Sequence, residues 1–243
     1  MPRAPSYRLS YTFGPGPLST AVKALILTNV AVFLVSLLAR PITFFFGLIP
    51  VAVVEQLRVW QLVTYMFLHG GVLHILFNML ALWMFGTELE RMWGTRFFVK
   101  YYFVTGVGAA VLTVLLSFLP FDFATRLYSS VTIGASGAIY GLLLAYGLYF
   151  PDRPIYVYAI FPIPAKYFVM IFGAIALLSS VSASDSGTAH IAHLGGLLVG
   201  YLYLKGGRIH PWSAVKYRYL KWKFNRARRR FDVYSGGRTD RIH

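Results

Sequence analysis

The feature that most constrains this chain is a series of six apolar runs, each close to the length needed to cross a lipid bilayer. They cover residues 20–39, 73–92, 96–118, 134–150, 164–182 and 190–205. A spanning helix needs about 20 mainly apolar residues, and inside a bilayer only helices or closed barrels satisfy every backbone polar group. We therefore expect an all-α polytopic membrane protein with six transmembrane helices. The fourth run is short and holds four glycines, so its helix is expected to begin partway down, buried among the others.

The composition agrees with a membrane protein and defines its parts. Hydrophobic residues make up 57% of the chain and charged residues 13%, whereas about a quarter of a soluble domain is charged. One membrane domain, 20–205, is expected between an N-terminal segment, 1–19, and a tail, 206–243. The first run is long enough to span and has no small-residue cleavage site near its end, so we expect it to be retained. The absence of cysteine excludes disulfides, cysteine-bound metal and a thiol nucleophile.

The net charge of +15 is largely a property of the tail, where 12 of the 23 Lys and Arg residues lie at or after Lys205. These cations alternate with aromatic residues, which suits binding to anionic lipid headgroups at a membrane surface. Nucleic-acid binding is the weaker alternative, because a basic segment next to six spans is sufficiently explained as a membrane anchor. We therefore expect no nucleic-acid partner.

Basic residues near the spans predict the orientation. Those on one side of a six-span bundle are Arg91, Arg96, Lys100, Arg153, Lys166 and the tail, against Arg40, Arg58 and Arg126 on the other. By the positive-inside rule both termini should be cytoplasmic. A chain without organelle-targeting features suits a multi-pass protein of the bacterial inner membrane. The first connection, 40–72, is long and apolar and should lie in the membrane interface.

Several histidines fall in regions where a lipid bilayer disfavours ionisable side chains. His69, His74, His190 and His193 sit at or within predicted spans, while all eight acidic residues map to loops, helix ends or the tail. Polar groups at such depth are costly and serve as functional hypotheses. His74 and Asn78 are four residues apart and share a helix face.

Two glycine-rich runs should bring a serine to a histidine. Gly196 and Gly200 form a small-residue face on which His193 lies, and Ser136 stands between Gly134 and Gly137. Small residues allow two helices to pack closely, so we expect Ser136 to face His193.

A serine becomes a useful nucleophile when an imidazole takes its proton. With no carboxylate in the spans, a Ser136/His193 dyad is expected, in which Tyr140, one turn beyond Ser136, helps to orient the histidine. His74, Asn78 and the Ser136 backbone N–H are the expected donors to the oxyanion. This chemistry needs neither a metal nor a cofactor.

Each of these residues also has a simpler interpretation. The serine would then be a packing residue, the histidine a buried hydrogen-bond partner and Asn78 an interhelical polar clamp. Their joint occurrence favours catalysis. Haem or metal ligation by the histidine pairs leaves Ser136 and Asn78 unexplained, and a transporter lacks its paired intramembrane charges.

These motifs resemble the rhomboid family of intramembrane serine proteases over about residues 20–205. Gly134-Ala-Ser136-Gly137 is similar to the family's GxSG motif, His69 to Asn78 to its HxxxxHxxxN pattern, and His193-Leu-Gly-Gly196 to its base motif. The stretch from Glu90 to Gly94 resembles a structural segment of the family.

The resemblance implies a six-helix rhomboid-like bundle with a water-filled cavity that opens opposite the cytoplasm. Ser136 would be the nucleophile, His193 the base and acid, His74 and Asn78 parts of the oxyanion hole, and Tyr140 a stacking partner of His193. The first connection would be a membrane-embedded loop, the fifth helix a lateral gate and residues 183–188 a cap. Substrates would be single-span membrane proteins.

Two positions depart from this pattern or stand outside it. Gln61 follows Trp60 where many relatives carry arginine, which leaves the stability of the loop open. His190 is a secondary candidate for the base only. A non-enzymatic relative that binds membrane clients is the remaining alternative, although such relatives typically lack the serine or the histidine.

Overall fold

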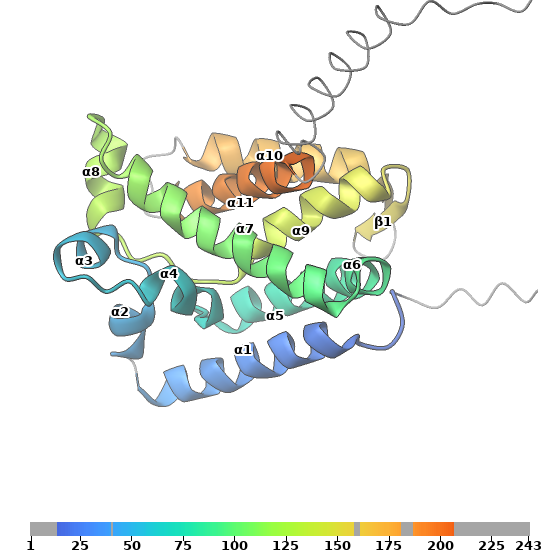
Figure 1. Cartoon of the computed structure of the whole chain (residues 1–243), viewed down its shortest axis with the longest axis horizontal. Coiled ribbons are helices and arrows are strands. Elements are labelled where there is room, and N and C mark those ends of the chain that lie inside the picture. The colour runs from blue at the N-terminus through green and yellow to red at the C-terminus, as the bar shows by residue number, and fades with distance from the viewer. Residues whose placement is uncertain (1–13, 40, 158–160, 181–186, 207–243) are drawn as a thin grey trace, which may run out of the picture. The chain divides into compact units, whose positions relative to one another are not determined.

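The described part of the computed structural model comprises residues 14–39, 41–157, 161–180 and 187–206, and it is mainly helical (Figure 1). The longer helices are α1 (Thr20–Leu38), α7 (Thr95–Leu116), α9 (Ser136–Tyr149), α10 (Ala165–Ser180) and α11 (Gly187–Gly206). The second apolar run forms α5 (Val72–Ala81), a π-helical turn η2 (Leu82–Gly86) and α6 (Thr87–Trp93). Shorter elements are α2 (Ile42–Phe46), α3 (Pro50–Glu55), α4 (Gln61–Thr64), the 3-10 turn η1 (Tyr65–Phe67) and α8 (Asp122–Ser129).

Three of the described helical segments are long and apolar enough to cross a membrane, namely Thr20–Leu38, Val72–Trp93 and Thr95–Leu116. The chain is therefore a multi-pass membrane protein. The helices α9 and α10 are apolar but have only 14 and 16 residues. The total of six transmembrane helices therefore stays a prediction. As expected for the fourth run, α9 is short and most of its residues are buried.

The connection between α9 and α10 is a short β-hairpin within this mostly helical fold. There β1 (Pro154–Val157) and β2 (Phe161–Pro164) form an antiparallel pair in which Ile155 lies opposite Ile163. Proline lacks the N–H that a helix interior needs and biases the residue before it toward extended backbone. The alternation Phe-Pro-Ile-Pro in β2 therefore cannot continue a helix.

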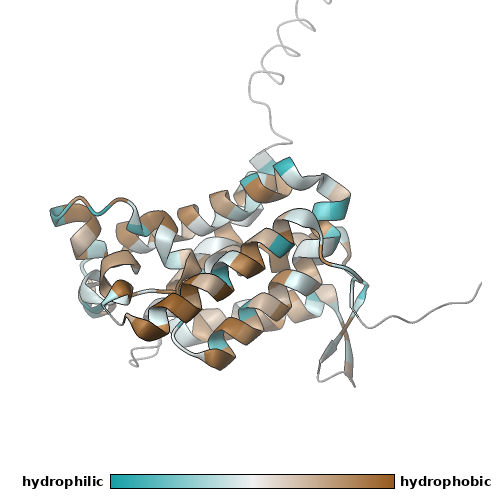
Figure 2. Cartoon of the chain, turned by 90° about the horizontal axis from the view of Figure 1, so that it is seen from below, coloured by the Kyte–Doolittle hydropathy of each residue, from teal (hydrophilic) through white to brown (hydrophobic). Residues whose placement is uncertain are grey.

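The helix α7 is the centre of the bundle and contacts α1, α6, α8 and α9. Its residues Phe98, Tyr101 and Tyr102 are fully buried. Large apolar side chains are exposed along the outer helices, and the ribbon of these helices is largely coloured as hydrophobic (Figure 2). Large exposed apolar surfaces are unusual on soluble proteins, and on a membrane protein they suit contact with lipid.

Glu90 fastens α1 to the junction of α6 and α7. Its carboxylate is buried and accepts hydrogen bonds from the Ser19 hydroxyl at 2.5 Å, from the Ala21 and Val22 backbone N–H groups and from the Thr95 hydroxyl at 2.7 Å. A negative charge at the first turn of a helix satisfies N–H groups that have no intrahelical partner. We call this set of contacts the Glu90 latch.

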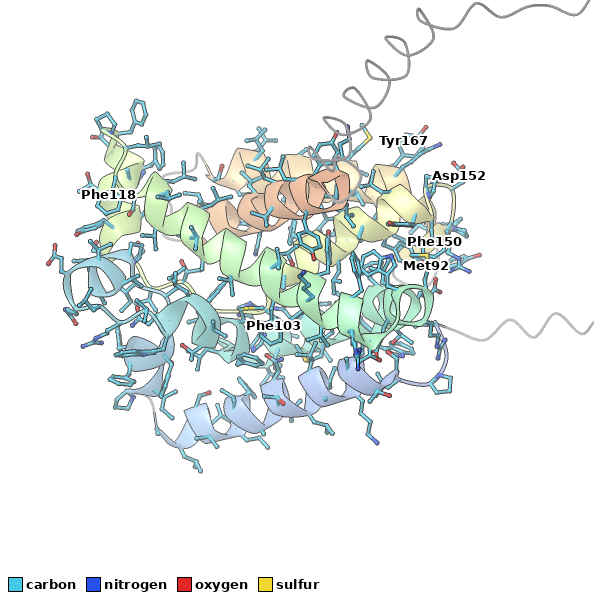
Figure 3. The ribbon with its side chains drawn as sticks, viewed as in Figure 1. Met92, Phe103, Phe118, Phe150, Asp152 and Tyr167 are labelled. Carbon is cyan, nitrogen blue, oxygen red and sulfur yellow. The ribbon has the colours of Figure 1, made fainter. Side chains whose placement is uncertain are left out.

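Ion pairs mark one end of the bundle, where Phe150, Asp152 and Tyr167 lie, whereas Phe118 lies at the opposite end (Figure 3). Lys166 donates to Asp152 at 2.7 Å, and Arg153 pairs with Glu88 of α6. Both basic side chains are more than two fifths exposed. These pairs join the β-hairpin region to α6 and α10 at the surface.

The first connection is folded, and Gln61 holds it together. The Gln61 side chain is fully buried, accepts from the Ile49 backbone N–H at 3.0 Å and donates to the Phe45 carbonyl at 3.2 Å. Gln61, which departs from the family pattern, thus uses both its amide oxygen and its amide nitrogen in hydrogen bonds within this connection.

Two contacts connect this loop with the segment that follows α7. Leu48 and Thr132 exchange two backbone hydrogen bonds of 2.9 and 2.8 Å. The Tyr128 hydroxyl donates to Glu55, and this bond to a carboxylate raises the pKa of Tyr128. The loop is therefore fixed against the chain that leads to Ser136.

Candidate active site

Ser136 is the first residue of α9, and the chain makes a turn at Gly134 and Ala135 directly before it. Gly134 has a φ of +122°, a backbone conformation that favours glycine. Its N–H donates to the Tyr65 carbonyl at 2.9 Å. The predicted start of the helix at 134 was therefore two residues early, because a positive φ cannot continue an α-helix. The first N–H groups of α9, including that of Ser136, have no carbonyl acceptor within the helix.

The helices α9 and α11 meet at glycine, as the small-residue pattern predicted. A Cβ on Gly196 would lie 1.8 Å from the Gly137 carbonyl oxygen, and one on Gly200 would lie 3.3 Å from the Gly141 Cα. Both values describe direct backbone contact, which no larger residue would permit at Gly196. The third member of this packing is α7, since a Cβ on Gly195 would lie 3.0 Å from the Ala109 Cα.

This close approach joins Ser136 to His193, which is 57 residues further along the chain. His193 Nε2 lies 2.7 Å from Ser136 Oγ, within hydrogen-bond distance. The Tyr140 ring stacks on the His193 imidazole with centroids 4.3 Å apart and an interplanar angle of 6°. Stacking of this kind restricts the rotation of the imidazole and keeps Nε2 directed at the serine.

The other nitrogen of His193 has a different environment. Within the described residues Nδ1 is buried and has no hydrogen-bond partner, so no carboxylate in this part of the chain orients the ring. His190 packs edge-on against His193 with centroids 5.2 Å apart. It is thus a neighbour of the His193 ring, whereas the hydrogen bond to Ser136 is made by His193. Among the described residues, the hydrogen bond between Ser136 and His193 therefore has no further polar partner at His193 Nδ1.

His74 lies beside Gly134 and presents one nitrogen to this site. Its Nδ1 accepts from the Gly70 backbone N–H at 3.3 Å, so a neutral His74 carries its proton on Nε2. A Cβ on Gly134 would lie 2.8 Å from that Nε2 and 3.6 Å from Ser136 Oγ. Glycine at 134 therefore leaves room for an N–H donor next to the serine hydroxyl.

Asn78 is on the same helix as His74, one turn further along, and is buried. Its side-chain amide donates to the His74 carbonyl at 2.8 Å. An amide NH₂ group has two hydrogens, so this bond leaves one N–H of Asn78 for another acceptor. The structure brings together His74, Gly134, Ser136, Tyr140 and His193, with Asn78 bonded to the His74 backbone.

One residue of the neighbourhood, Tyr65, had no signal in the sequence motifs, and it contacts the chain before Ser136. His69, the first residue of the HxxxxHxxxN pattern, lies edge-on to His74 with centroids 5.0 Å apart. Tyr65 lies in a stretch that was interpreted only as an apolar interfacial loop. A single tyrosine in such a loop carries no spacing that reveals its partner.

Most of the expected cap, residues 183–188, lies outside the described residues, and its last two residues begin α11. Residues 181–186 lie outside the described residues, as does the tail from 207 onward. In the described part of the chain no group of three or more His, Asp or Glu side chains is arranged to hold a metal ion. The histidine pairs at 69/74 and 190/193 are each in ring contact instead.

Comparison with known proteins gives one consistent result. A family profile described as the Rhomboid domain matches residues 56–207, more than half of the chain. Rhomboid-like protein 15 of Arabidopsis thaliana is 29% identical over 180 residues, which are 72% of this chain and 43% of that protein. Rhomboid protein 1, mitochondrial, of Saccharomyces cerevisiae is 32% identical over 138 residues, which are 56% of this chain and 38% of that protein.

Rhomboid protease GluP of Bacillus subtilis is 32% identical over 158 residues, which are 64% of this chain and 27% of that protein. This chain thus spans less than half the length of these three relatives. The family profile, at residues 56–207, covers both Ser136 and His193.

Proposed function

The chain belongs to the rhomboid family, and from this membership we propose that it is an intramembrane serine endopeptidase with a Ser136/His193 dyad. Relatives named as rhomboid proteases support a protease. The observation that carries the proposal is the 2.7 Å contact between His193 Nε2 and Ser136 Oγ. A hydroxyl that touches an imidazole can lose its proton to that ring as it attacks a carbonyl carbon.

In the proposed reaction the Ser136 oxygen forms a bond to the scissile carbonyl carbon while its proton moves to His193 Nε2. The resulting oxyanion would accept hydrogen bonds from His74 Nε2–H, the Ser136 backbone N–H and the second amide hydrogen of Asn78. Collapse of this intermediate breaks the C–N bond, and the imidazolium gives its proton to the leaving amine. Water, deprotonated by His193, then hydrolyses the acyl-enzyme and restores the serine.

Tyr140 takes the place of a third catalytic residue in this proposal. In triads an aspartate orients the histidine through Nδ1, whereas here Nδ1 has no partner among the described residues. The stacked Tyr140 ring would orient the imidazole by contact. Gly134 and Gly137 support the site by allowing His74 and α11 to approach Ser136.

The proposed setting is a six-span domain, residues 20–205, with the segments 1–19 and 206–243 on the cytoplasmic side. A bacterial inner membrane is the proposed location, and the basic tail would bind anionic lipid headgroups there. The substrates would be single-span membrane proteins. Their helix would have to unwind near its outer end, where small or helix-breaking residues lower the cost of exposing backbone.

The proposal is tested by replacing the two members of the pair. Ser136→Ala and His193→Ala should each reduce cleavage of a transmembrane reporter by about 10⁴-fold or more, as in other enzymes with such a nucleophile and base. Ser136→Ala should leave the thermal unfolding midpoint in detergent unchanged, since only one oxygen is removed. The reporter fragments are measured in proteoliposomes.

Ser117→Ala is the matched control, because it removes a buried serine hydroxyl that bonds to the Val114 carbonyl at the end of α7. Cleavage should stay within about twofold of wild type in this variant, since the loss of one ordinary hydrogen bond changes stability rather than chemistry. Undiminished cleavage by both Ser136→Ala and His193→Ala would falsify the dyad. A wild-type protein that binds but never cleaves its clients would support the non-enzymatic alternative.

A further inference from the structure

Tyr65 stands outside every motif of the sequence, yet it joins the chain before Ser136 to the centre of the bundle. Its side chain is 1% exposed. Its carbonyl accepts from the Gly134 N–H at 2.9 Å, and its hydroxyl donates to the Gly106 carbonyl of α7 at 2.8 Å. One residue thus fastens the segment that leads into α9 to a helix that does not carry the serine.

The Tyr65 hydroxyl also lies between α7 and α9. A Cβ on Gly137 would be 3.0 Å from this hydroxyl, and a Cβ on Gly106 would be 3.3 Å from the Ala138 Cβ. The hydroxyl therefore occupies the space beside Gly137 while it donates to the Gly106 carbonyl. If the Tyr65 ring shifts, then either α9 or the backbone carbonyl of Tyr65 must shift with it.

The position of that carbonyl matters because Gly134 is next to the reacting groups. The Gly134 backbone, held at a positive φ, lies against His74 Nε2 and two residues before Ser136. A misplacement of about 1 Å of a reacting group can cost about 10²-fold in rate. A contact that fixes Gly134 therefore influences both the nucleophile and the expected oxyanion donor.

We infer that Tyr65 is a positioning residue for the nucleophile, acting through the Gly134 N–H and the Gly106 carbonyl. The inference rests on the proposed function, since it assigns a role in the chemistry of Ser136. Tyr65 does not touch the reacting atoms in this arrangement. Its hydroxyl holds the 3-10 turn η1 against α7, and its carbonyl then holds the chain that precedes the nucleophile.

Tyr101 offers a matched control within the same bundle. It is also fully buried, and its hydroxyl donates to the Gly141 carbonyl of α9 at the same distance of 2.8 Å. Among the contacts of the described residues, none joins Tyr101 to the segment 130–135 that precedes α9. Tyr101→Phe thus removes an equivalent hydrogen bond without releasing Gly134.

The experiment compares full-length wild type, Tyr65→Phe and Tyr101→Phe in proteoliposomes. For each we would measure kcat and KM on a transmembrane reporter, and the rate at which a small fluorophosphonate labels Ser136, per folded molecule. Tyr65→Phe removes the hydrogen bond that holds η1 against α7, so kcat and the labelling rate should fall by about tenfold while KM stays within about twofold. Tyr101→Phe should change both rates by less than about twofold despite a similar loss of thermal stability.

The outcomes separate this inference from the proposed function. A labelled, active wild type whose Tyr65→Phe variant keeps both rates, or loses no more than Tyr101→Phe, overturns the positioning role alone. A wild type that is not labelled at Ser136 overturns the proposed function, and the inference with it. A loss seen in KM alone would assign Tyr65 to substrate binding and would also overturn the positioning role.

Discussion

The crossing of α9 and α11 and the Glu90 latch both fix helices against each other, but they use different interactions. At the crossing, glycine backbones touch, and the nearest atoms around Gly196 are those of the Gly137 peptide. At the latch, one buried carboxylate accepts hydrogen bonds from the start of α1 and from Thr95 of α7. The crossing therefore depends on volume, and the latch depends on charge and hydrogen bonding.

The difference indicates where the chain tolerates change. Packing between small residues involves no directional bond. An added carbon atom at the contact is therefore strongly destabilising, whereas the polarity of the side chain matters little. A buried carboxylate is stable only as long as its donors remain, so loss of its charge is costly while the neighbouring volume matters less. Only the crossing carries the serine and histidine pair, so damage there should affect catalysis and stability together.

The largest effect should come from Gly196→Ala. Its methyl group would overlap the Gly137 carbonyl oxygen, so α9 and α11 must separate, which should cost about 3 kcal/mol of unfolding free energy. Cleavage per folded molecule should fall by about 10²-fold or more, since Ser136 and His193 move apart with their helices. Denaturant unfolding in micelles and the reporter assay measure the two effects.

Gly173→Ala in α10 is the control for that substitution, because the nearest atom to its new methyl group would be Leu197 Cδ1 at 3.5 Å. This is ordinary contact, and alanine is the better helix former, so stability should be unchanged or slightly higher. If Gly196→Ala behaves like Gly173→Ala, the account of a crossing limited by volume is wrong.

A smaller effect is expected from Glu90→Gln, which keeps the shape of the latch and removes its charge. The new amide NH₂ would face N–H and hydroxyl donors, so we expect a loss of about 2 kcal/mol in unfolding free energy. Cleavage per folded molecule should stay within about twofold, because the latch does not contact the site. A loss of activity that exceeds the loss of folded protein would contradict the separation of the two regions.

The smallest effect should follow from breaking the partly exposed pair between Glu88 and Arg153. Both Glu88→Gln and Arg153→Met remove one member, and exposed ion pairs contribute about 0.5 kcal/mol in general. Glu88→Gln is also the control for Glu90→Gln, because it neutralises a carboxylate on the same helix two residues away. Equal unfolding midpoints for the two glutamine variants would show that burial of the Glu90 carboxylate is not what makes the latch strong.

Much of the helical structure was predictable, since apolar runs in lipid must satisfy their own backbone. The predicted runs 20–39, 96–118 and 164–182 correspond closely to α1, α7 and α10. The run 73–92 became two helices joined by a π-helical turn, and the connection after α9 became a β-hairpin. Turns of this kind depend on contacts with other elements, which apolar periodicity does not record.

The candidate site was predictable as far as its motifs reach. The shared face of His74 and Asn78 follows from helical spacing, and the approach of α9 to α11 follows from their glycines. The hydrogen bond from Gly70 to His74 and the hydrogen bonds of Tyr65 were not predictable. Each joins a backbone group to a partner whose position only the folded chain defines. Gln61 was a doubtful loop residue in the sequence and is a buried hydrogen-bonding residue in the fold.

The sequence by itself determined that this chain is a helical membrane protein with a small-residue face around Ser136 and another around His193. Helical spacing and the exclusion of unpaired backbone groups from lipid are local rules, so they can be applied residue by residue. The tertiary structure decided that these two faces meet, that Tyr140 stacks on the imidazole and that Tyr65 holds Gly134. Those contacts join residues far apart in the chain, and their geometry depends on how α7, α9 and α11 pack together.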